Sequence, residues 1–265
     1  MAIQAHNEKA AATWGSGGGE YDKISECIAD SIEHVLNRLD VRPGEHVLDL
    51  ATGTGWTARR LAQKGAKVVG LDIGGGVIDA AKGFAQKANL DIEFAVGDAE
   101  GTDFPDASFD VIASTCGVMF ASRPEAVARE LTRLCRRGGR IGLTTWPPTS
   151  TLAGMFQMMR PYMPPPPSPA PPSPFEWGRP ERVSELLGGS FDLKFETGTT
   201  VLRMPSGEYI WDVFSTGYGP TKMLYRTSER KDELRRDFIA FHDAYSTGMG
   251  VAMPRDYLVV IGIRR

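Results

Sequence analysis

The stretch VLDLATGTG, residues 47–55, decides the fold, because an apolar run ending in an acid leads into two glycines at alternate positions. Gly53 and Gly55 lack a Cβ, so the turn can adopt unusual backbone angles and let a ligand lie against bare backbone. Residues 56–64 have helical character, and Gly65 is placed to end that helix. A strand, glycine turn and helix present free N–H groups where the helix begins. Alone, this unit indicates a nucleotide-like cofactor and does not distinguish NAD from S-adenosylmethionine.

Two further acids follow apolar runs downstream. Residues 68–76 read VVGLDIGGG, which places Asp72 at the end of a second strand. A carboxylate there can accept hydrogen bonds from both hydroxyls of a ribose. Residues 92–100 read IEFAVGDAE, which places Asp98 and Ala99 just beyond a third strand, where they can meet an adenine ring. With these acids, the prediction includes the ribose and the adenine of an adenosine ligand as well as the glycine turn.

Helical segments separate the predicted strands. Apolar residues recur at helical spacing over 20–39, 77–88 and 125–136, whereas 109–115 and 136–146 have the composition of strands. Strands that alternate with helices form right-handed βαβ units. The pattern therefore predicts an α/β fold with a mainly parallel sheet.

With these motifs in order, the chain resembles the class I S-adenosylmethionine-dependent methyltransferases, in the small-molecule branch similar to the ubiquinone and menaquinone biosynthesis C-methyltransferases. The resemblance covers about residues 10–146 and rests on four ordered signals, VLDLATGTG, VVGLD, GDAE before FPDASFD, and ELTRLCRRGGR. It implies a Rossmann-like, doubly wound, seven-stranded sheet that is mainly parallel, with an antiparallel C-terminal strand and a substrate-covering insertion after the fifth strand. It also implies S-adenosylmethionine as the cofactor and S-adenosylhomocysteine as the product.

The resemblance further implies the residues that contact the cofactor. The methionine and ribose side would be lined by Asp49, Ala51, Gly53, Thr54 and Gly55. Asp72 would hold the ribose hydroxyls, and Ile73 would flank the adenine. Asp98 and Ala99 would read the adenine edge, while Thr115 would face the sulfonium.

The family resemblance extends to an N-terminal cap over residues 14–21, in which Trp14 and Tyr21 would close over the cofactor. One departure follows Asp72, where the family often has Ser-Pro and this chain has glycines at 74–76. Glycine is only a slightly poorer helix cap than serine, but each glycine adds chain entropy that folding must remove. We therefore expect a mobile loop there.

Length and composition suit one large globular domain, since the chain has 265 residues of which 42% are hydrophobic. We expect a cofactor-binding core with an N-terminal cap helix over 1–146, and over 147–265 a substrate-covering segment of the same domain, with a proline-rich loop and closing strands. A net charge of −3 gives no general attraction to nucleic acid or to an anionic membrane. Three widely spaced cysteines predict reduced thiols, and no stretch approaches the roughly 18 apolar residues that cross a bilayer. The expectation is a cytoplasmic protein without a nucleic-acid partner or membrane insertion.

The pattern changes after Trp146. Residues 161–174, PYMPPPPSPAPPSP, hold nine of the eighteen prolines and predict an extended or stiff loop. Such a loop is a spacer, a lid over the substrate, or a ligand for an SH3-type domain. The elements predicted beyond it are a helix over 180–187, a strand over 191–204, helices within 206–246 and a closing strand over 257–263.

Methyl transfer from a sulfonium is an in-line displacement, so the protein mainly positions the reactants and excludes water. An alcohol or phenol acceptor would also need a general base. The candidates for such a catalytic group are His242, which has a helix or core position as its alternative, and Tyr21. Ser114 and Thr115 are poor magnesium ligands, so no metal is predicted.

The acceptor is expected to be a small, partly apolar metabolite. Residues that would form its pocket, or would otherwise fill the core, are Cys116, Met119, Trp146, Tyr162, Trp177 and Tyr218. Two other functions remain open at this point: an NAD(P)-dependent oxidoreductase, and a non-catalytic protein that senses or binds the cofactor on the same fold.

Overall fold

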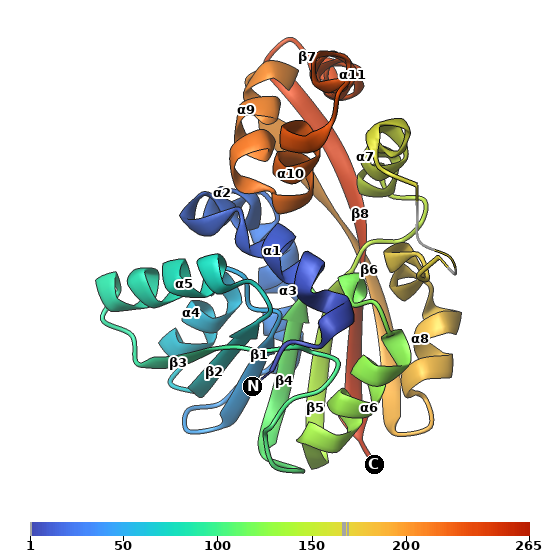
Figure 1. The fold of residues 1–265 in the computed structure, drawn as a ribbon. Helices are drawn as coiled ribbons and strands as arrows, with labels where there is room; N and C mark the ends of the chain where they lie inside the picture. The colour runs from blue at the N-terminus through green and yellow to red at the C-terminus, as the bar shows by residue number, and fades with distance from the viewer. Residues whose placement is uncertain (1, 166–167, 169) are drawn as a thin grey trace.

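The computed structural model describes residues 2–165, 168 and 170–265. One twisted sheet runs through the molecule, with helices on both faces and a further group of helices beyond its upper end (Figure 1). The main path of the sheet has the order β3-β2-β1-β4-β5-β8-β6. Its strands are β1 (His46–Leu50), β2 (Lys67–Asp72), β3 (Ile92–Val96), β4 (Phe109–Thr115), β5 (Cys135–Thr145), β6 (Phe191–Met204) and β8 (Gly250–Arg264).

Strands β1 to β5 pair in parallel, whereas β8 is antiparallel to both β5 and β6. The predicted Rossmann-like fold with an antiparallel C-terminal strand is therefore confirmed. A short strand β7 (Ser246–Thr247) pairs with β8 beside the main path. Four of the five residues of β1 are buried, as expected for a parallel strand that is covered on both faces.

The helices form layers on the two faces of the sheet. The larger helices are α1 (Glu8–Gly15), α2 (Tyr21–Glu26), α3 (Ala29–Leu39), α4 (Trp56–Gln63), α5 (Gly75–Lys87), α6 (Pro124–Leu134), α7 (Thr151–Met159), α8 (Pro180–Leu187), α9 (Gly207–Gly217), α10 (Gly219–Thr227) and α11 (Lys231–Asp243). Because β1, β2 and β3 run to one edge and β4 then returns beside β1, right-handed crossovers put α4 and α5 on one face and α6 on the other. The strand order reverses between β1 and β4, and ligands of such sheets bind at the carboxyl ends of the strands at this point.

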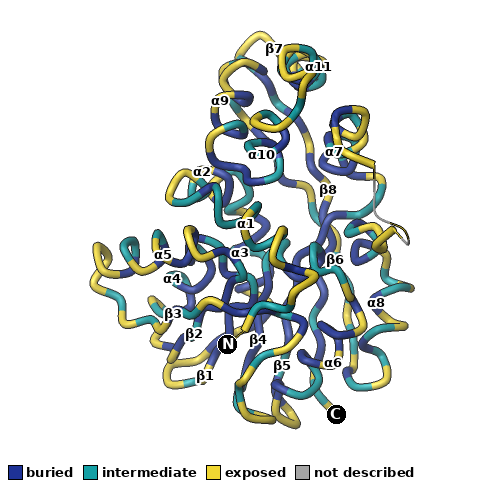
Figure 2. The backbone as a smooth tube through the Cα atoms, in the orientation of Figure 1, coloured by how far each residue is buried: buried dark blue, intermediate teal, exposed yellow. Residues whose placement is uncertain are grey.

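Strands β6 and β8 continue beyond the parallel strands. Thr145, the last residue of β5, pairs with Leu258, whereas β8 remains paired with β6 as far as Val251. The part of β8 before Leu258 therefore extends past the carboxyl edge of the sheet, beside α9, α10 and α11 (Figure 1). Figure 2 shows that buried residues follow the strands and the inward sides of the helices, and that exposed residues lie on the outer helices and turns.

Several local predictions differ from the structure. The closing strand predicted over 257–263 begins earlier, because β8 starts at Gly250. The helix predicted over 20–39 is interrupted, because α2 ends at Glu26 and α3 begins at Ala29. The helix predicted over 125–136 ends at Leu134, and Gly138, with a φ of 72°, lies inside β5 where the register with β4 shifts. In the proline-rich segment, residues 166, 167 and 169 lie outside the described residues.

A further difference concerns the glycines after Asp72. A mobile loop is predicted there, but Gly75 and Gly76 form the first turn of α5. A Cβ on Gly76 would lie 2.4 Å from the backbone oxygen of Gly15, and a Cβ on Gly74 would lie 2.7 Å from the Gly15 nitrogen. The prediction of a loop is therefore wrong, because these glycines let the end of α1 pack directly on the start of α5.

Candidate active site

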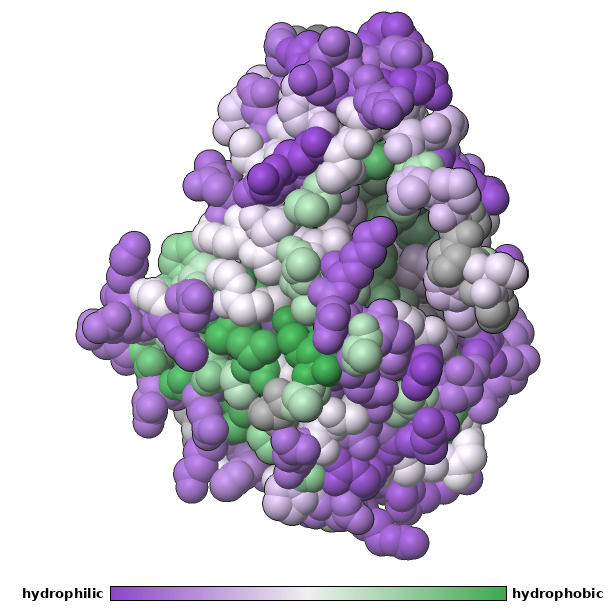
Figure 3. Space-filling model, in the orientation of Figure 1, coloured by the Kyte–Doolittle hydropathy of each residue, from purple (hydrophilic) through white to green (hydrophobic). Residues whose placement is uncertain are grey.

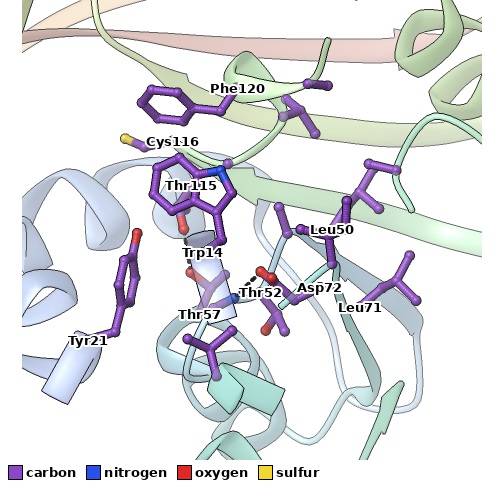
Figure 4. Close-up of a pocket in the computed structure, with 18 of the residues that line it drawn as sticks. Trp14, Tyr21, Leu50, Thr52, Thr57, Leu71, Asp72, Thr115, Cys116 and Phe120 are labelled. Atoms are coloured by element: carbon purple, nitrogen blue, oxygen red, sulfur yellow. Dashed lines mark hydrogen bonds between the residues drawn. The ribbon is translucent and has the colours of Figure 1, made fainter. Parts of the chain in front are cut away.

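A pocket opens at the carboxyl ends of β1, β2, β3 and β4, beneath the N-terminal helices (Figure 4). It encloses about 1040 Å³ of empty space, a volume that includes its open mouth. Figure 3 shows apolar surface gathered in the middle of this face of the molecule, with hydrophilic residues around it. Ten residues singled out from the sequence line the pocket: Trp14, Tyr21, Ala51, Gly53, Asp72, Ile73, Asp98, Ala99, Thr115 and Cys116.

Asp72 joins two of the loops around the pocket. Its Oδ2 accepts a hydrogen bond of 2.8 Å from the Gly53 N–H, and its Oδ1 accepts one of 2.8 Å from the Gly74 N–H. Burial raises the pKa of this carboxyl, while the backbone donors act in the opposite direction. Each carboxylate oxygen has a second lone pair. The side chain can therefore hold the glycine turn and still accept from a hydroxyl group in the pocket.

Asp98 fastens the N-terminal segment to the end of β3. Its Oδ2 accepts from the Asn7 Nδ2, at 2.9 Å, and its Oδ1 accepts from the Glu100 N–H, at 3.0 Å. His6 Nε2 lies 2.8 Å from Glu100 Oε2. The N-terminal segment around His6 is therefore bonded to the loop after β3.

Asp49 lies beneath the pocket rather than in its lining. The side chain has no exposed area, its Oδ2 accepts from the Thr52 hydroxyl, and its Oδ1 has no hydrogen-bond partner among the described residues. Burial raises the pKa of Asp49 to about 7. Of the three strand-end acids, two border the pocket and the third is buried under it.

The other motif residues shape the turn without lining the pocket. The Thr54 hydroxyl donates to Asp22 Oδ1 at 2.7 Å, which ties the turn to α2. Gly55 precedes α4 with a φ of 79°, and a Cβ there would lie 2.9 Å from the Phe94 ring. Both residues therefore act on the pocket through the backbone that they position.

Two residues beside the pocket have backbone angles that L-residues rarely adopt. Ala51 and Cys116 each have a φ of 59°, in the left-handed region that favours glycine. The loops that carry them, after β1 and β4, approach each other closely, because a Cβ on Gly117 would lie 2.4 Å from the Ala51 Cβ. Such strain persists only where the surroundings enforce it, and it is concentrated at functional sites.

The cap residues Trp14 and Tyr21 form one aromatic wall. Trp14 packs 4.9 Å from the Phe120 ring and edge-on to Tyr21, and Tyr218 stacks on Tyr21 from outside at 6.4 Å. Gly53 has a φ of 57°, and a Cβ on it would approach the Tyr21 ring to 3.3 Å. Burial, with smaller contributions from Asp72 and Cys116, raises the pKa of Tyr21, so the phenol stays protonated at neutral pH.

Sequence reasoning missed several lining residues, among them Asn7, Ser25, Ile28, Thr52, Trp56, Thr57 and Gly117. Thr52 and Thr57 flank the glycine turn, and the Thr57 and Thr115 hydroxyls lie 2.8 Å apart (Figure 4). Proximity to the motif could have identified these two. Asn7 comes from a distant segment whose docking depends on Asp98, so no local signal marks it.

Most residues proposed to touch the acceptor pack elsewhere. Met119, Trp146 and Trp177 are buried in the core, and Tyr218 lies behind Tyr21. The Tyr162 hydroxyl donates to Asp237 on α11. Within this set, only Cys116 belongs to the pocket lining.

His242 is a core residue. It has no exposed area, its Nδ1 donates to the Phe238 carbonyl oxygen at 2.8 Å, and its Nε2 has no partner among the described residues. The ring packs 4.4 Å from that of Phe238. Because it lies outside the pocket lining, its position does not allow it to take a proton from an acceptor there, contrary to its prediction as a candidate base.

Burial lowers the pKa of His242 from 6.5 to about 4. The unfolded chain therefore binds more protons between these values, and stability should fall by about 3 kcal/mol as the pH falls from 6.5 to 4. In urea titrations across this range, His242→Gln should lose that part of the pH dependence. Equal slopes for both proteins would show that His242 titrates normally in the folded state.

The charged side chains of the pocket lining favour some classes of ligand over others. Asp72 and Asp98 are its charged members, and among the described lining residues there is no lysine, arginine or histidine. Two carboxylates favour a ligand with hydroxyl groups and positive charge, such as S-adenosylmethionine, over one with a pyrophosphate. Within the described part of the chain, no cluster of side chains could hold a metal ion, and no helix is long and apolar enough to cross a membrane.

Comparison with known proteins agrees with this geometry. A family model described as "Methyltransferase domain" matches residues 48–143. An uncharacterized protein of Mycobacterium tuberculosis is 33% identical over 210 residues, which is 78% of this chain and 76% of that protein. The demethylmenaquinone methyltransferase of Beutenbergia cavernae is 33% identical over 146 residues, 51% of this chain and 59% of that protein. The crystal structure of the YcgJ protein from Bacillus subtilis shares the fold, with a TM-score of 0.61 and 20% identity, over 89% of this chain and 99% of that chain. The chain belongs to the class I S-adenosylmethionine-dependent methyltransferases, and S-adenosylmethionine is its cofactor.

Proposed function

We propose that this methyltransferase acts on a small, partly apolar metabolite, held in the same pocket as the cofactor and under the aromatic wall of the cap. The observation that carries the proposal is the lining itself. It combines two strand-end carboxylates with apolar and aromatic side chains, and no basic residue among its described members would suit a nucleic-acid backbone.

For the cofactor, we assign the ribose hydroxyls to Asp72 and the adenine to Ile73, Asp98 and Ala99. Support comes from the spare lone pairs of Asp72 and from the position of Asp98 beside Ala99 in the lining. The glycine turn would carry the methionine part, because Gly53 leaves bare backbone facing the pocket. Asp49 would act from beneath the pocket. Burial raises its pKa, and the positive charge of the cofactor bound above it would favour the ionised carboxylate.

For the acceptor, we assign the space beside Cys116 and the cap. Trp14, Tyr21 and Phe120 face this space from three elements (Figure 4). When bound, S-adenosylmethionine supplies the methyl group. The aromatic wall would exclude water and fix the nucleophile in line with the reacting bond. Burial raises the pKa of Cys116, so its thiol stays protonated and does not compete as a nucleophile.

Calorimetry and a transfer assay together test this function. S-adenosylmethionine and S-adenosylhomocysteine should bind at micromolar concentrations, whereas NAD and NADPH should show no heat of binding. Radiolabelled methyl groups should pass to members of a panel of small apolar metabolites, and not to RNA or DNA. Binding of NADPH, or labelling of nucleic acid alone, would contradict the proposal.

A further inference from the structure

Arg255 is a buried cation without an anionic partner among the described residues. The residue is 2% exposed, and its Nε and Nη2 have no hydrogen-bond partner among the described residues. No aspartate or glutamate in the described chain forms an ion pair with it. The titratable groups that influence its pKa are Cys27, Tyr218 and Cys116, each of which is neutral at neutral pH.

The position of Arg255 in the sheet places it at the ligand-binding edge. It pairs with Thr200 of β6, in the part of β8 that extends past the end of β5. Its Cζ lies 5.6 Å from the Phe214 ring centroid on α9, so an aromatic face provides its principal contact. Ligands of this fold bind outside the carboxyl ends of the parallel strands, which is the level that Arg255 reaches.

Arg255 also lies close behind the pocket. The groups that interact electrostatically with Arg255 include Cys116, which belongs to the lining, and Cys27, which lies in the sequence between the lining residues Ser25 and Ile28. The Phe214 ring, which contacts the Arg255 guanidinium, lies 5.5 Å from the ring of Tyr218, and Tyr218 stacks on Tyr21 of the lining. Figure 3 shows the surface hollowed between α10 and α7, on the side of the molecule where β8 passes. The Thr151 hydroxyl at the start of α7 donates to the backbone oxygen of Pro254, next to Arg255.

An unpaired buried guanidinium destabilises the fold that contains it. Burial lowers the pKa of Arg255 only to about 10, so the side chain remains charged at neutral pH. Phe214 offsets part of the cost, because a cation is attracted to an aromatic face. Contacts within the described chain do not offset the rest of the free-energy cost of burying this charge. An anionic ligand bound to the guanidinium would offset it.

The two free donors have a definite shape. The N–H bonds of Nε and Nη2 lie side by side on one edge of the planar guanidinium, where they match the two oxygens of a carboxylate or a phosphoryl group. The pocket lining itself holds no cation among its described residues, and Arg255 lies behind it. We propose that Arg255 binds a two-oxygen anionic group of the methyl acceptor, so that the substrates are small apolar molecules carrying a carboxylate or a phosphoryl group. This inference rests on the function proposed above.

Three simple probes test the anion site on protein saturated with S-adenosylhomocysteine. They are benzoate, its neutral isostere benzamide, and phenylphosphonate, each titrated by calorimetry and by thermal unfolding. An oxyanion should bind at least about tenfold more tightly than benzamide, and the better of benzoate and phenylphosphonate identifies the group. Equal binding of all three probes, or binding of none, would overturn the inference.

Two variants and a control assign the effect to Arg255. Arg255→Met should abolish the preference for the anion, and should raise the melting temperature of the ligand-free protein because an unpaired buried charge is removed. Arg255→Lys keeps the charge but not the paired donors, so it should weaken anion binding about tenfold even if the methionine variant fails to fold. Arg203→Met, on the exposed side of β6, should change neither property.

The affinity for S-adenosylhomocysteine separates this inference from the proposed function. Both Arg255 variants should keep it within about twofold of the original. A tenfold loss would mean that Arg255 pairs with the carboxylate of the cofactor, which contradicts an acceptor site. A lower melting temperature of ligand-free Arg255→Met would show a structural role and would also contradict it. No binding of S-adenosylhomocysteine to the unaltered protein would instead reject the proposed function.

Discussion

Replacing Asp72 by alanine is expected to weaken S-adenosylmethionine binding about 100-fold, close to 2.7 kcal/mol, and to lower the free energy of unfolding by about 2–4 kcal/mol. The carboxylate holds the Gly53 and Gly74 N–H groups at the same time. Its removal leaves two buried donors without a partner and releases the glycine turn, in addition to the lost contact with the ribose. Calorimetry and urea titration measure the two effects separately.

A graded variant and a control sharpen this test. Asp72→Asn keeps one oxygen acceptor but presents an NH2 group to the other backbone donor, so both losses should be intermediate. Asp79→Ala, an exposed change one turn into α5, should alter stability by less than about 0.5 kcal/mol. Unchanged cofactor affinity in Asp72→Ala, alongside the loss of stability, would show that Asp72 is a structural residue and that the ribose lies elsewhere.

Two glycines of α5 are expected to respond to alanine with opposite signs. A Cβ on Gly76 would meet the Gly15 oxygen at 2.4 Å, whereas a Cβ on Gly83 would meet nothing within 4 Å. Gly83→Ala should therefore stabilise the protein by about 0.5–1 kcal/mol, the usual gain in helix propensity. Gly76→Ala should destabilise it by about 1–3 kcal/mol, because α1 must move.

The same pair tests whether the N-terminal cap acts on the cofactor. Trp14 precedes Gly15 and lines the pocket, so displacement of α1 in Gly76→Ala should weaken cofactor binding about tenfold. Gly83→Ala should leave binding unchanged. Equal stability and equal affinity of the two variants in urea titration and calorimetry would mean that α1 packs loosely and that the cap has no energetic role.

Local signals were sufficient for most of the fold. The helix predicted over 180–187 and the strand predicted over 191–204 have the same bounds in the structure. The glycine turn and the acids near the strand ends could be predicted, because each depends on the geometry of only a few consecutive residues. The breaks near Cys27 and Gly138 were missed, since both depend on pairing and packing with distant segments.

The residues of the candidate site could be predicted from the sequence only in part. Asp72 and Asp98 line the pocket, but Asp49, which follows an apolar run in the same way, lies inside β1 and is buried below the pocket. Aromatic composition could not separate Trp14, which lines the pocket, from Trp177, which fills the core. The sequence around Arg255 does not indicate that this residue is buried, because its burial arises from the long pairing of β6 with β8 and from the position of α9.

A crystal structure of the complex with S-adenosylhomocysteine tests the central claim most directly. The account predicts the ribose hydroxyls within hydrogen-bond distance of Asp72, the adenine between Ile73 and Ala99, and the sulfur facing Tyr21 and Cys116. Electron density for the ligand outside this pocket, or a ribose that does not contact Asp72, would contradict it.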